Sequence, residues 1–412
     1  MYLPAYYEFY CRVQIVAGHQ VLEKIPELLE RLKASTPMII TDKGITGAGL
    51  VDLVKSAIEG RTKVAAVEDD VPADSDLLTV TRIADKYREN HCDAIIAVGG
   101  GSVLDTAKGV NILVSEGSND LVKFSGAGAL KRRLKPLIAV PTTSGTGSEV
   151  TLVAVVADHE KQLKMLFTSN VLLPDVALLD SRMTMTLPPA ITAATGMDAM
   201  THAVEAYTCL AKNPLSDSHA TSAIELISKN ILNVVKNPDD KEGRLSLAIG
   251  ANLAGIAFSN SMVGMVHTLG HSVGAICGAP HGACMAVLLP YGLEYNRHKN
   301  ASFTAELLFP LAGPRIYAKT PSHSHADRVI SFLRQLNDDL HEATDGKHPR
   351  ALKEMKDSQG NPLISKDKLP EIARKGLGDG TTFYNPEELD YEDLMMVLNH
   401  AWEGTPLETQ EA

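Results

Sequence analysis

The sequence predicts an α/β domain with a parallel sheet at residues 1–186, followed by an all-α domain at residues 187–412. Two observations lead to this prediction. Before residue 187, short apolar runs rich in β-branched side chains alternate with stretches of helical periodicity. After the Leu187-Pro188-Pro189 segment, only the helical periodicity continues. Strands that alternate with helices form a parallel sheet that the helices cover on both faces.

The individual elements follow from the spacing of the apolar residues. In the first domain we expect strands at residues 37–42, 94–98 and 137–140, and helices at residues 21–34 and 77–90. In the second domain, helical periodicity covers residues 193–209, 216–235, 244–262 and 391–402. Residues 345–368 are polar and interrupted by Gly and Pro, which predicts a surface insertion.

Length and composition are ordinary for a globular enzyme of two or three domains, or of two large ones. The chain has 412 residues, of which 44% are hydrophobic and 22% charged. The formal net charge is −11, and no block of Lys and Arg is interleaved with aromatic residues, so we do not expect nucleic acid as a partner. The only short basic run, Lys131-Arg132-Arg133, is typical of a solvated loop.

Cysteine usage and the N-terminus indicate the compartment. The five cysteines are odd in number and lack CxxC spacing, so we expect neither a disulfide framework nor a cysteine zinc site. The N-terminus does not resemble a signal peptide, and no apolar run reaches the roughly 18 residues that a membrane span needs. We therefore expect a cytoplasmic protein with no membrane partner, assembled as a homodimer or higher homo-oligomer.

Two helix-spaced pairs of polar residues and one further histidine stand out in the second domain. Asp198 and His202 are four residues apart, as are His267 and His271, and His281 follows ten residues later. Residues four apart project from one face of a helix, so each pair can point at one spot. One carboxylate with several imidazoles makes a mixed oxygen and nitrogen site, which suits Fe(II) or Zn(II) better than Ca or Mg.

A single pair of this kind often arises by chance on a surface helix. Here both pairs lie among Ala, Gly, Met, Leu and Val. An unpaired polar group in such surroundings costs about 1–3 kcal/mol, and a shared metal ion would satisfy both pairs. Cys277 lies four residues before His281, but the intervening Gly278-Ala279-Pro280 segment interrupts the helix, so we expect that Cys277 is not a ligand.

A glycine-rich segment, Gly99-Gly100-Gly101-Ser102, follows the strand predicted at residues 94–98 and opens a helix that includes Asp105. Glycines permit positive φ angles and close approach of the backbone, and N–H groups at a helix N-terminus bind anions. The segment could be a tight structural turn, and it does not match GxGxxG. Because open α/β sheets bind ligands at the carboxyl ends of their strands, we expect it to cradle a pyrophosphate in a Rossmann-like domain.

A second loop and one acidic residue complete the expected nucleotide site. Residues 141–149 follow the strand predicted at 137–140, and the hydroxyl groups of Thr142, Thr143, Thr146 and Ser148 can bind the rest of a nucleotide. Asp42 closes the strand predicted at 37–42. A carboxylate there can accept a hydrogen bond from a ribose hydroxyl and would repel a 2′-phosphate, which favours NAD over NADP.

Taken together, these motifs resemble the iron-containing (group III) alcohol dehydrogenase family, which shares the dehydroquinate-synthase-like fold. The match covers nearly the whole chain, and the motifs come in the family's order. They are Gly99-Gly100-Gly101-Ser102 with Asp105 and Lys108, the loop 141–149, Leu187-Pro188-Pro189, Gly196-Met197-Asp198 with His202, and His267, His271 and His281.

The resemblance implies roles for individual residues. Asp198, His202, His267 and His281 would bind one divalent metal, usually Fe(II), although Zn(II) fits the same donors. His271 matches a histidine beside the nicotinamide of NAD and is the candidate for relaying a proton to solvent. Two further residues match positions at the coenzyme, namely Lys164 near the coenzyme and Asp42 at the adenosine ribose.

The implied reaction is hydride transfer between NAD(H) and a small primary alcohol or diol and its aldehyde, with the substrate alkoxide on a divalent iron. A zinc-dependent polyol dehydrogenase of the glycerol type on the same fold is one alternative. A second is a non-redox lyase or cyclase of the dehydroquinate synthase type, which would need several Lys or Arg residues near the metal, where this sequence has few. A third is a binding protein without catalytic activity, which the intact ligand set argues against.

Two segments depart from the family's pattern. Members often carry a Pro-Asn-Pro segment near the coenzyme, where this chain reads Val71-Pro72-Ala73-Asp74-Ser75. The insertion at residues 345–368 has no counterpart that the resemblance can place.

Overall fold

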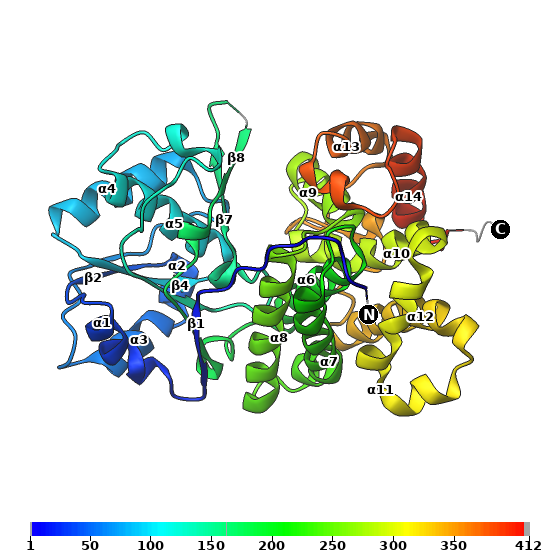
Figure 1. Ribbon diagram of the computed structural model, residues 1–412, viewed down its shortest axis with the longest axis horizontal. Helices are drawn as coiled ribbons and strands as arrows, with labels where there is room; N and C mark the ends of the chain where they lie inside the picture. Colours follow the sequence, from blue (N-terminus) through cyan, green and yellow to red (C-terminus); the bar gives the residue numbers. More distant parts are fainter. Residues whose placement is uncertain (1, 162, 408–412) are drawn as a thin grey trace. The chain divides into compact units, whose positions relative to one another are not determined.

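The structure is a computed structural model that describes residues 2–161 and 163–407, and it divides the chain into two compact units (Figure 1). One unit runs from Tyr10 to Thr186, and the other holds the described residues before Tyr10 and after Thr186. The predicted fold class is confirmed, because the first unit is an α/β structure with a parallel sheet and the second is helical. Residues before Tyr10 group with the helical unit, where Tyr2 packs edge-on against Phe303 at 5.8 Å between ring centroids.

Six parallel strands form the main sheet of the α/β unit, in the order β1-β9-β6-β4-β2-β3. Their bounds are β1 (Gln14–Gly18), β2 (Pro37–Ile40), β3 (Ala66–Glu68), β4 (Ala94–Gly99), β6 (Leu137–Pro141) and β9 (Val176–Asp180). The helices of this unit are α1 (Ile25–Arg31), α2 (Lys43–Gly47), α3 (Leu50–Ile58), α4 (Leu77–Glu89) and α5 (Gly101–Glu116).

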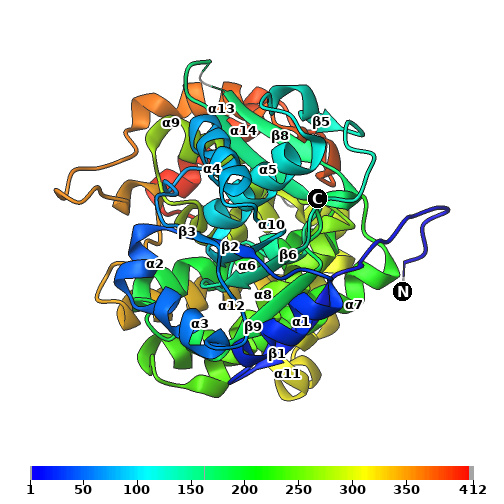
Figure 2. The same ribbon diagram turned by 90° about the vertical axis from the view of Figure 1, so that its left-hand side faces the viewer.

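The sheet is buried on both faces, with α1 and α3 on one side and α4 and α5 on the other (Figure 2). Ile39 of β2 and Ile96 of β4 belong to the core beneath α1 and α3. Their neighbours Met38 and Ile95 belong to the core beneath α4 and α5. Successive strand residues point to opposite faces, so a sheet with two apolar cores requires the continuous apolar runs seen in the sequence.

The strand order creates a topological switch point between β2 and β4. From β2 the chain passes through α2 and α3 to β3, on one side of β2. From β4 it passes through α5 to β6, on the other side. Open α/β sheets bind ligands in the crevice at the carboxyl ends of two such strands. Asp42 follows β2 and Gly100 follows β4, so both lie at this crevice.

A second, smaller sheet was not predicted. It consists of β5 (Gly126–Ala127), β8 (Leu163–Thr168) and β7 (Val153–Asp158), in that order. Strands β7 and β8 pair antiparallel, with Val153 opposite Thr168. The sequence alternates apolar and polar residues only weakly here, so its periodicity gave no signal of a two-stranded ribbon.

The second unit is mainly helical and packs around one hydrophobic core. None of the helices in the described ranges combines the length and apolarity that a membrane span requires. The helices are α6 (Pro189–Thr208), α7 (Pro214–Lys236), α8 (Lys241–Ser259), α9 (Met265–Cys277), α10 (His281–Glu306), α11 (Leu308–Lys319), α12 (His325–Ala343), α13 (Leu369–Gly376) and α14 (Tyr391–Glu403).

The segment 345–368 is not a simple surface insertion, and that prediction was wrong in part. Leu352, Met355 and Ile364 are buried in the core of the helical unit. The indole N–H of Trp402 in α14 also donates to the Ile364 carbonyl at 3.0 Å. The segment's low average hydropathy hid these isolated apolar anchors, and its longest exposed run is residues 356–362.

Helices α6 and α10 approach each other closely at Gly282. A Cβ atom added there would lie 2.5 Å from the Ala194 carbonyl oxygen, a backbone atom that cannot turn away. Asp198 and His281 flank this approach on α6 and α10. The spacing of these two side chains therefore depends on residue 282 having no side chain.

We expect Gly282→Ala to lower the free energy of unfolding by about 1–3 kcal/mol, because the added methyl group forces the two helices apart. Chemical denaturation measures this loss. Gly274→Ala is the matched control, since its Cβ would meet only ordinary contact at 3.5 Å. Equal stabilities of the two variants would contradict the steric explanation.

Candidate metal and coenzyme sites

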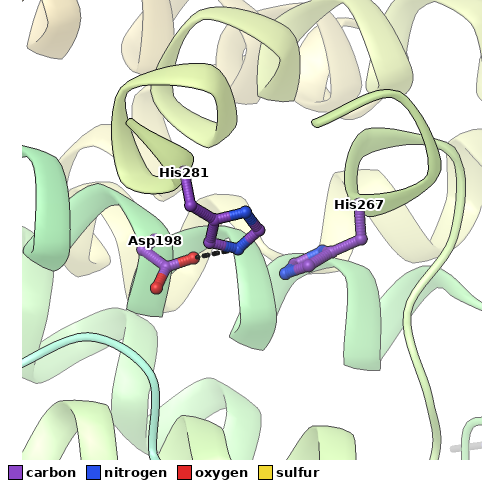
Figure 3. Close-up of side chains that lie close together, drawn as sticks. All are labelled: Asp198, His267 and His281. Atoms are coloured by element: carbon purple, nitrogen blue, oxygen red, sulfur yellow. Dashed lines mark ion pairs between the residues drawn. The ribbon is translucent and has the colours of Figure 1, made fainter. Parts of the chain in front are cut away.

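Asp198, His267 and His281 converge in the helical unit from three different helices (Figure 3). Asp198 lies in the middle of α6, His267 in the first turn of α9, and His281 at the start of α10. One ligand atom from each lies within 4.8 Å of the others. Asp198 Oδ1 and His281 Nε2 are 3.3 Å apart. Three donors at this spacing can bind a single ion.

His202, the fourth predicted ligand, lies beside this group. Its Nδ1 atom is 3.9 Å from Asp198 Oδ1, one helical turn away on α6. Its ring stacks on His267 at 4.6 Å between centroids and on Phe258 at 4.2 Å. The structure therefore brings all four predicted ligands together. His202 is not part of the group of three residues whose donor atoms lie within 4.8 Å of one another, but it lies beside that group.

The donor atoms satisfy a test for a bound cation. Asp198 Oδ1, His202 Nδ1 and His267 Nε2 are buried, and none has a hydrogen-bond partner in the described part of the chain. Each such atom costs about 1–3 kcal/mol if it stays unsatisfied. One of these atoms is a carboxylate oxygen and two are imidazole nitrogens, the donors that a divalent transition metal prefers.

The protonation states also suit a metal. Burial lowers the pKa of His202 to about 3 and that of His267 well below its ordinary value. Burial by itself would raise the pKa of Asp198, but the positive charges that His202 and His281 carry when protonated favour the carboxylate and hold this pKa below its usual range. At neutral pH Asp198 is thus a carboxylate, and His202 and His267 are neutral imidazoles, the forms that bind metal ions.

Glu205 is a site residue that the sequence reasoning missed. It lies on α6 three residues after His202, and it is buried. Its Oε2 atom is 2.5 Å from His267 Nδ1, and its Oε1 atom accepts a hydrogen bond from the Val266 N–H at 2.8 Å. The spacing of Glu205 could have indicated this role. Asp198, His202 and Glu205 stand at positions i, i+4 and i+7, so the three share one helix face.

His271 also has an acidic partner that was missed. Its Nδ1 atom lies 2.9 Å from Asp379 Oδ2, and Asp379 comes from the segment that begins the short helix η9 (Gly380–Tyr384). Burial would raise the pKa of Asp379, but hydrogen bonds from His271 and Thr381 lower it to about 2. The His271 ring stacks on His281 at 5.4 Å, so it lies at the edge of the metal-binding cluster.

In the α/β unit, the glycine-rich segment forms the predicted turn between β4 and α5. Gly100 is the N-cap of α5, and no side chain caps this helix, which leaves the start of α5 suited to an anion. Gly99, Gly100 and Gly101 do not use the positive φ angles that glycine permits. Space is the reason for glycine here. A Cβ at Gly99 would lie 2.5 Å from Val103, and one at Gly101 would lie 2.9 Å from Thr146.

The second loop lies directly against this turn. A Cβ atom added at Gly100 would lie 3.5 Å from Thr143, and Gly101 likewise lies close to Thr146. The Thr142 N–H donates to the Gly99 carbonyl at 3.1 Å. The Thr142 hydroxyl is buried and has no hydrogen-bond partner among the described residues, so it is available to a ligand. The two loops thus form one continuous surface at the carboxyl ends of β4 and β6.

Asp105 and Ser148 bind each other in the structure. The Ser148 hydroxyl donates to Asp105 Oδ1 at 2.7 Å, and the Val155 N–H donates to Asp105 Oδ2 at 3.0 Å. The buried Lys108 ammonium donates to the Ser148 hydroxyl at 3.1 Å and to the Val153 carbonyl at 2.7 Å. These bonds attach the second loop and β7 to α5, so both predicted coenzyme residues act as braces in this geometry.

The remaining predicted coenzyme residues surround the cradle. Asp42 is the N-cap of α2, where its Oδ1 atom accepts from the Ile45 N–H at 2.9 Å. The Ser102 hydroxyl donates to the Ala73 carbonyl. Lys164 of β8 pairs with Asp74 at 2.9 Å, and both side chains are about half exposed. Residues 71–75, the segment that departs from the family's pattern, therefore contact the glycine-rich cradle.

A cavity lies at the opposite edge of the sheet. It has a volume of about 410 Å³ and is lined by Arg12, Arg31, Arg133 and Asp175. Asp175 precedes β9, so the cavity is at the amino ends of the strands. Arg133 is already paired with Asp175 at 2.9 Å. Because nucleotides bind at the carboxyl ends of such sheets, the cradle is the better candidate coenzyme site.

Comparison with known proteins identifies the family. The family model described as "Iron-containing alcohol dehydrogenase" matches residues 13–181, and the one described as "Fe-containing alcohol dehydrogenase family, C-terminal" matches residues 192–402. "Alcohol dehydrogenase 4" of Saccharomyces cerevisiae is 30% identical over 388 residues, which cover 94% of this chain and 96% of that protein. The "1,3-propanediol dehydrogenase" of Klebsiella pneumoniae is 31% identical over 387 residues, covering 93% and 96%.

A solved structure agrees with these matches. The crystal structure of a 1,3-propanediol oxidoreductase superimposes with a TM-score of 0.89 at 30% identity, covering 96% of this chain and 100% of the other. Both units are therefore matched in sequence and in structure. The sequence resemblance is confirmed, and the chain belongs to the iron-containing alcohol dehydrogenase family, a family of oxidoreductases.

Proposed function

We propose that this chain interconverts small primary alcohols or diols and aldehydes by NAD(H)-linked hydride transfer, with a divalent iron held by Asp198, His202, His267 and His281. The observation that carries the proposal is the convergence of donor atoms from Asp198, His267 and His281 within 4.8 Å of one another. Two of these atoms, Asp198 Oδ1 and His267 Nε2, are buried without a hydrogen-bond partner in the described residues. The glycine-rich cradle at the switch point of the sheet supports a dinucleotide coenzyme.

The chemistry that the ion supplies when bound is Lewis acidity toward an alcohol or aldehyde oxygen, and the chemistry of NAD is hydride acceptance at the nicotinamide. The protein's own residues hold these groups in place. Asp198 supplies the negative charge, and His202 and His267 supply neutral nitrogens because burial disfavours their protonation. Phe258 stacks on His202 and shields one side of the cluster from water.

His271 is the residue that we propose moves the hydroxyl proton. Asp379 has a lowered pKa and is ionised at neutral pH, so it accepts a hydrogen bond from His271 Nδ1–H. This leaves His271 Nε2 as the nitrogen that can take up a proton. The side chain is 43% exposed, so a proton held there can pass to solvent. In aldehyde reduction the same nitrogen returns the proton.

A lyase of the dehydroquinate synthase type fits this cluster less well. Such an enzyme binds a phosphorylated polyhydroxy acid and needs cationic side chains beside its metal. The contacts of Asp198, His267 and His281 are instead with other histidines, Glu205 and one another. A zinc-dependent polyol dehydrogenase would use the same donors, so metal analysis separates that alternative from an iron enzyme.

The reaction itself is tested with Fe(II)-loaded protein, NADH and a series of short aldehydes. We expect loss of nicotinamide fluorescence on adding an aldehyde. His281→Ala or His267→Ala should remove bound metal and lower turnover by more than about 100-fold, while NADH still binds. His323→Ala, at an exposed histidine of the same unit, is the control. Normal metal content and activity in the His281 variant would refute the ligand assignment.

Coenzyme choice should depend on Asp42. A carboxylate facing a 2′-phosphate costs several kcal/mol when both are desolvated, so Asp42→Gly should raise kcat/KM with NADP relative to NAD by about tenfold or more. Asp42→Asn is the control for the helix cap, because asparagine keeps the bond to the Ile45 N–H but removes the charge. If the wild-type enzyme already prefers NADP, the assignment of Asp42 to the adenosine ribose of the coenzyme is wrong.

Exposure to air should inactivate the enzyme if iron is its metal, because Fe(II) can be oxidised and Zn(II) cannot. Fe(II) added with a reductant should restore an aerated sample. Cys277→Ala should keep the metal and most activity, since Cys277 is not in the group of converging donors. Metal content is measured after anaerobic purification. Full activity after prolonged aeration, with one equivalent of zinc per chain, would show that the metal is zinc and not iron.

A further inference from the structure

The carboxylate of Glu205 makes a set of contacts that neither a simple core residue nor a metal ligand needs. It extends from α6 to the first turn of α9, a helix whose N-cap, Gly264, provides no side-chain cap. Oε1 accepts from the Val266 N–H at 2.8 Å, and Oε2 approaches the His267 N–H at 3.3 Å. Glu205 thus caps α9 from another helix and fixes the position of His267 in the first turn of α9.

The same carboxylate also determines the orientation of the His267 ring. Oε2 lies 2.5 Å from His267 Nδ1. A carboxylate that already receives backbone N–H bonds is an acceptor, so the proton of the neutral imidazole must sit on Nδ1. The lone pair of the ring is then on Nε2, which is the buried atom that faces Asp198 and has no hydrogen-bond partner in the described residues.

We infer that Glu205 is a positioning residue that holds His267 in the tautomer required for metal binding. The inference rests on the proposed metal-dependent function. Glu205 is not one of the converging donors, and both of its oxygens are engaged with α9. Partners of this kind on metal-binding histidines change metal affinity by about 10–100-fold when they are lost.

Glu205→Gln is the informative substitution, because it keeps size and shape and changes only the donor pattern. If its oxygen faces the Val266 N–H, its amide N–H group faces His267 Nδ1. Nδ1 must then accept, and the proton moves to Nε2, where it blocks the metal. If the amide is turned around, its N–H group meets the Val266 N–H and the cap is lost. Either arrangement weakens metal binding.

The chain offers a matched control. Asp379 contacts Nδ1 of His271 at 2.9 Å, in the same cluster, but His271 is not among the converging donors. Asp379→Asn makes the same carboxylate-to-amide change. We expect Glu205→Gln to weaken Zn(II) binding by about 10–100-fold in a chelator competition, and Asp379→Asn to leave it nearly unchanged.

The tautomer is measured directly on metal-free protein by ¹⁵N NMR of the histidine side chains, with His267→Gln to assign the resonance. Wild type should show a protonated Nδ1 at His267, and Glu205→Gln should shift the proton toward Nε2 or leave a mixture. Far-UV circular dichroism checks that the variant is folded. Should it unfold, the wild-type tautomer still decides, since a proton on Nε2 there overturns the inference.

The two proposals can fail separately. Wild-type protein that binds neither Zn(II) nor Fe(II) would refute the proposed function, whatever Glu205 does. Wild-type protein that binds metal tightly, with Glu205→Gln binding it equally well, would leave the function standing and refute the role of Glu205. Equal losses of affinity in the Glu205 and Asp379 variants would likewise overturn a specific role for Glu205, because any amide in the cluster would have the same effect.

Discussion

The negative charge of Asp198 is the constraint on which the helical unit depends. The side chain is only 3% exposed, and removing a carboxylate from water costs several kcal/mol unless a cation or strong hydrogen bonds compensate. Its neighbours His202 and His267 are neutral at physiological pH, so they contribute dipoles rather than positive charge. A divalent cation would supply the missing charge, and its binding free energy would then contribute to folding.

Helix α6 organises the whole cluster. Asp198, His202 and Glu205 occupy successive turns of one of its faces. The first two face the convergence point, and the third holds the start of α9. Helix α10 is placed by a different device, the close approach of Gly282 to the Ala194 backbone. Helices α9 and α10 are therefore each fixed against α6 within a few residues of the candidate ligand that they carry.

The sequence could predict those features that depend on local periodicity. The buried strands β2, β4 and β6 appear as continuous apolar runs, and the spacing of Asp198 and His202 follows from one helical turn. Long-range pairings leave no such mark. The ribbon of β7 and β8, the anchoring of Ile364 beside Trp402, and the bond from His271 to Asp379 across 108 residues all depend on tertiary packing. Glu205 was readable by its spacing, but its meaning depends on where α9 begins.

In the α/β unit, too, some polar residues hold the fold together and others are left to bind a ligand. Asp105, Lys108 and Ser148 are polar residues in a ligand-binding motif, yet their hydrogen bonds are made to one another and to β7. Burial lowers the pKa of Lys108 to about 8, which is the expected result of desolvating an ammonium group inside such a network. The Thr142 hydroxyl differs because it is buried without a partner among the described residues. A polar group that the fold buries and leaves unsatisfied costs stability, and a bound ligand can recover that cost. Burial without a hydrogen-bond partner therefore singles out Thr142 at the cradle, and Asp198, His202 and His267 at the candidate metal site. Residue type alone would also have selected Asp105, Lys108 and Ser148.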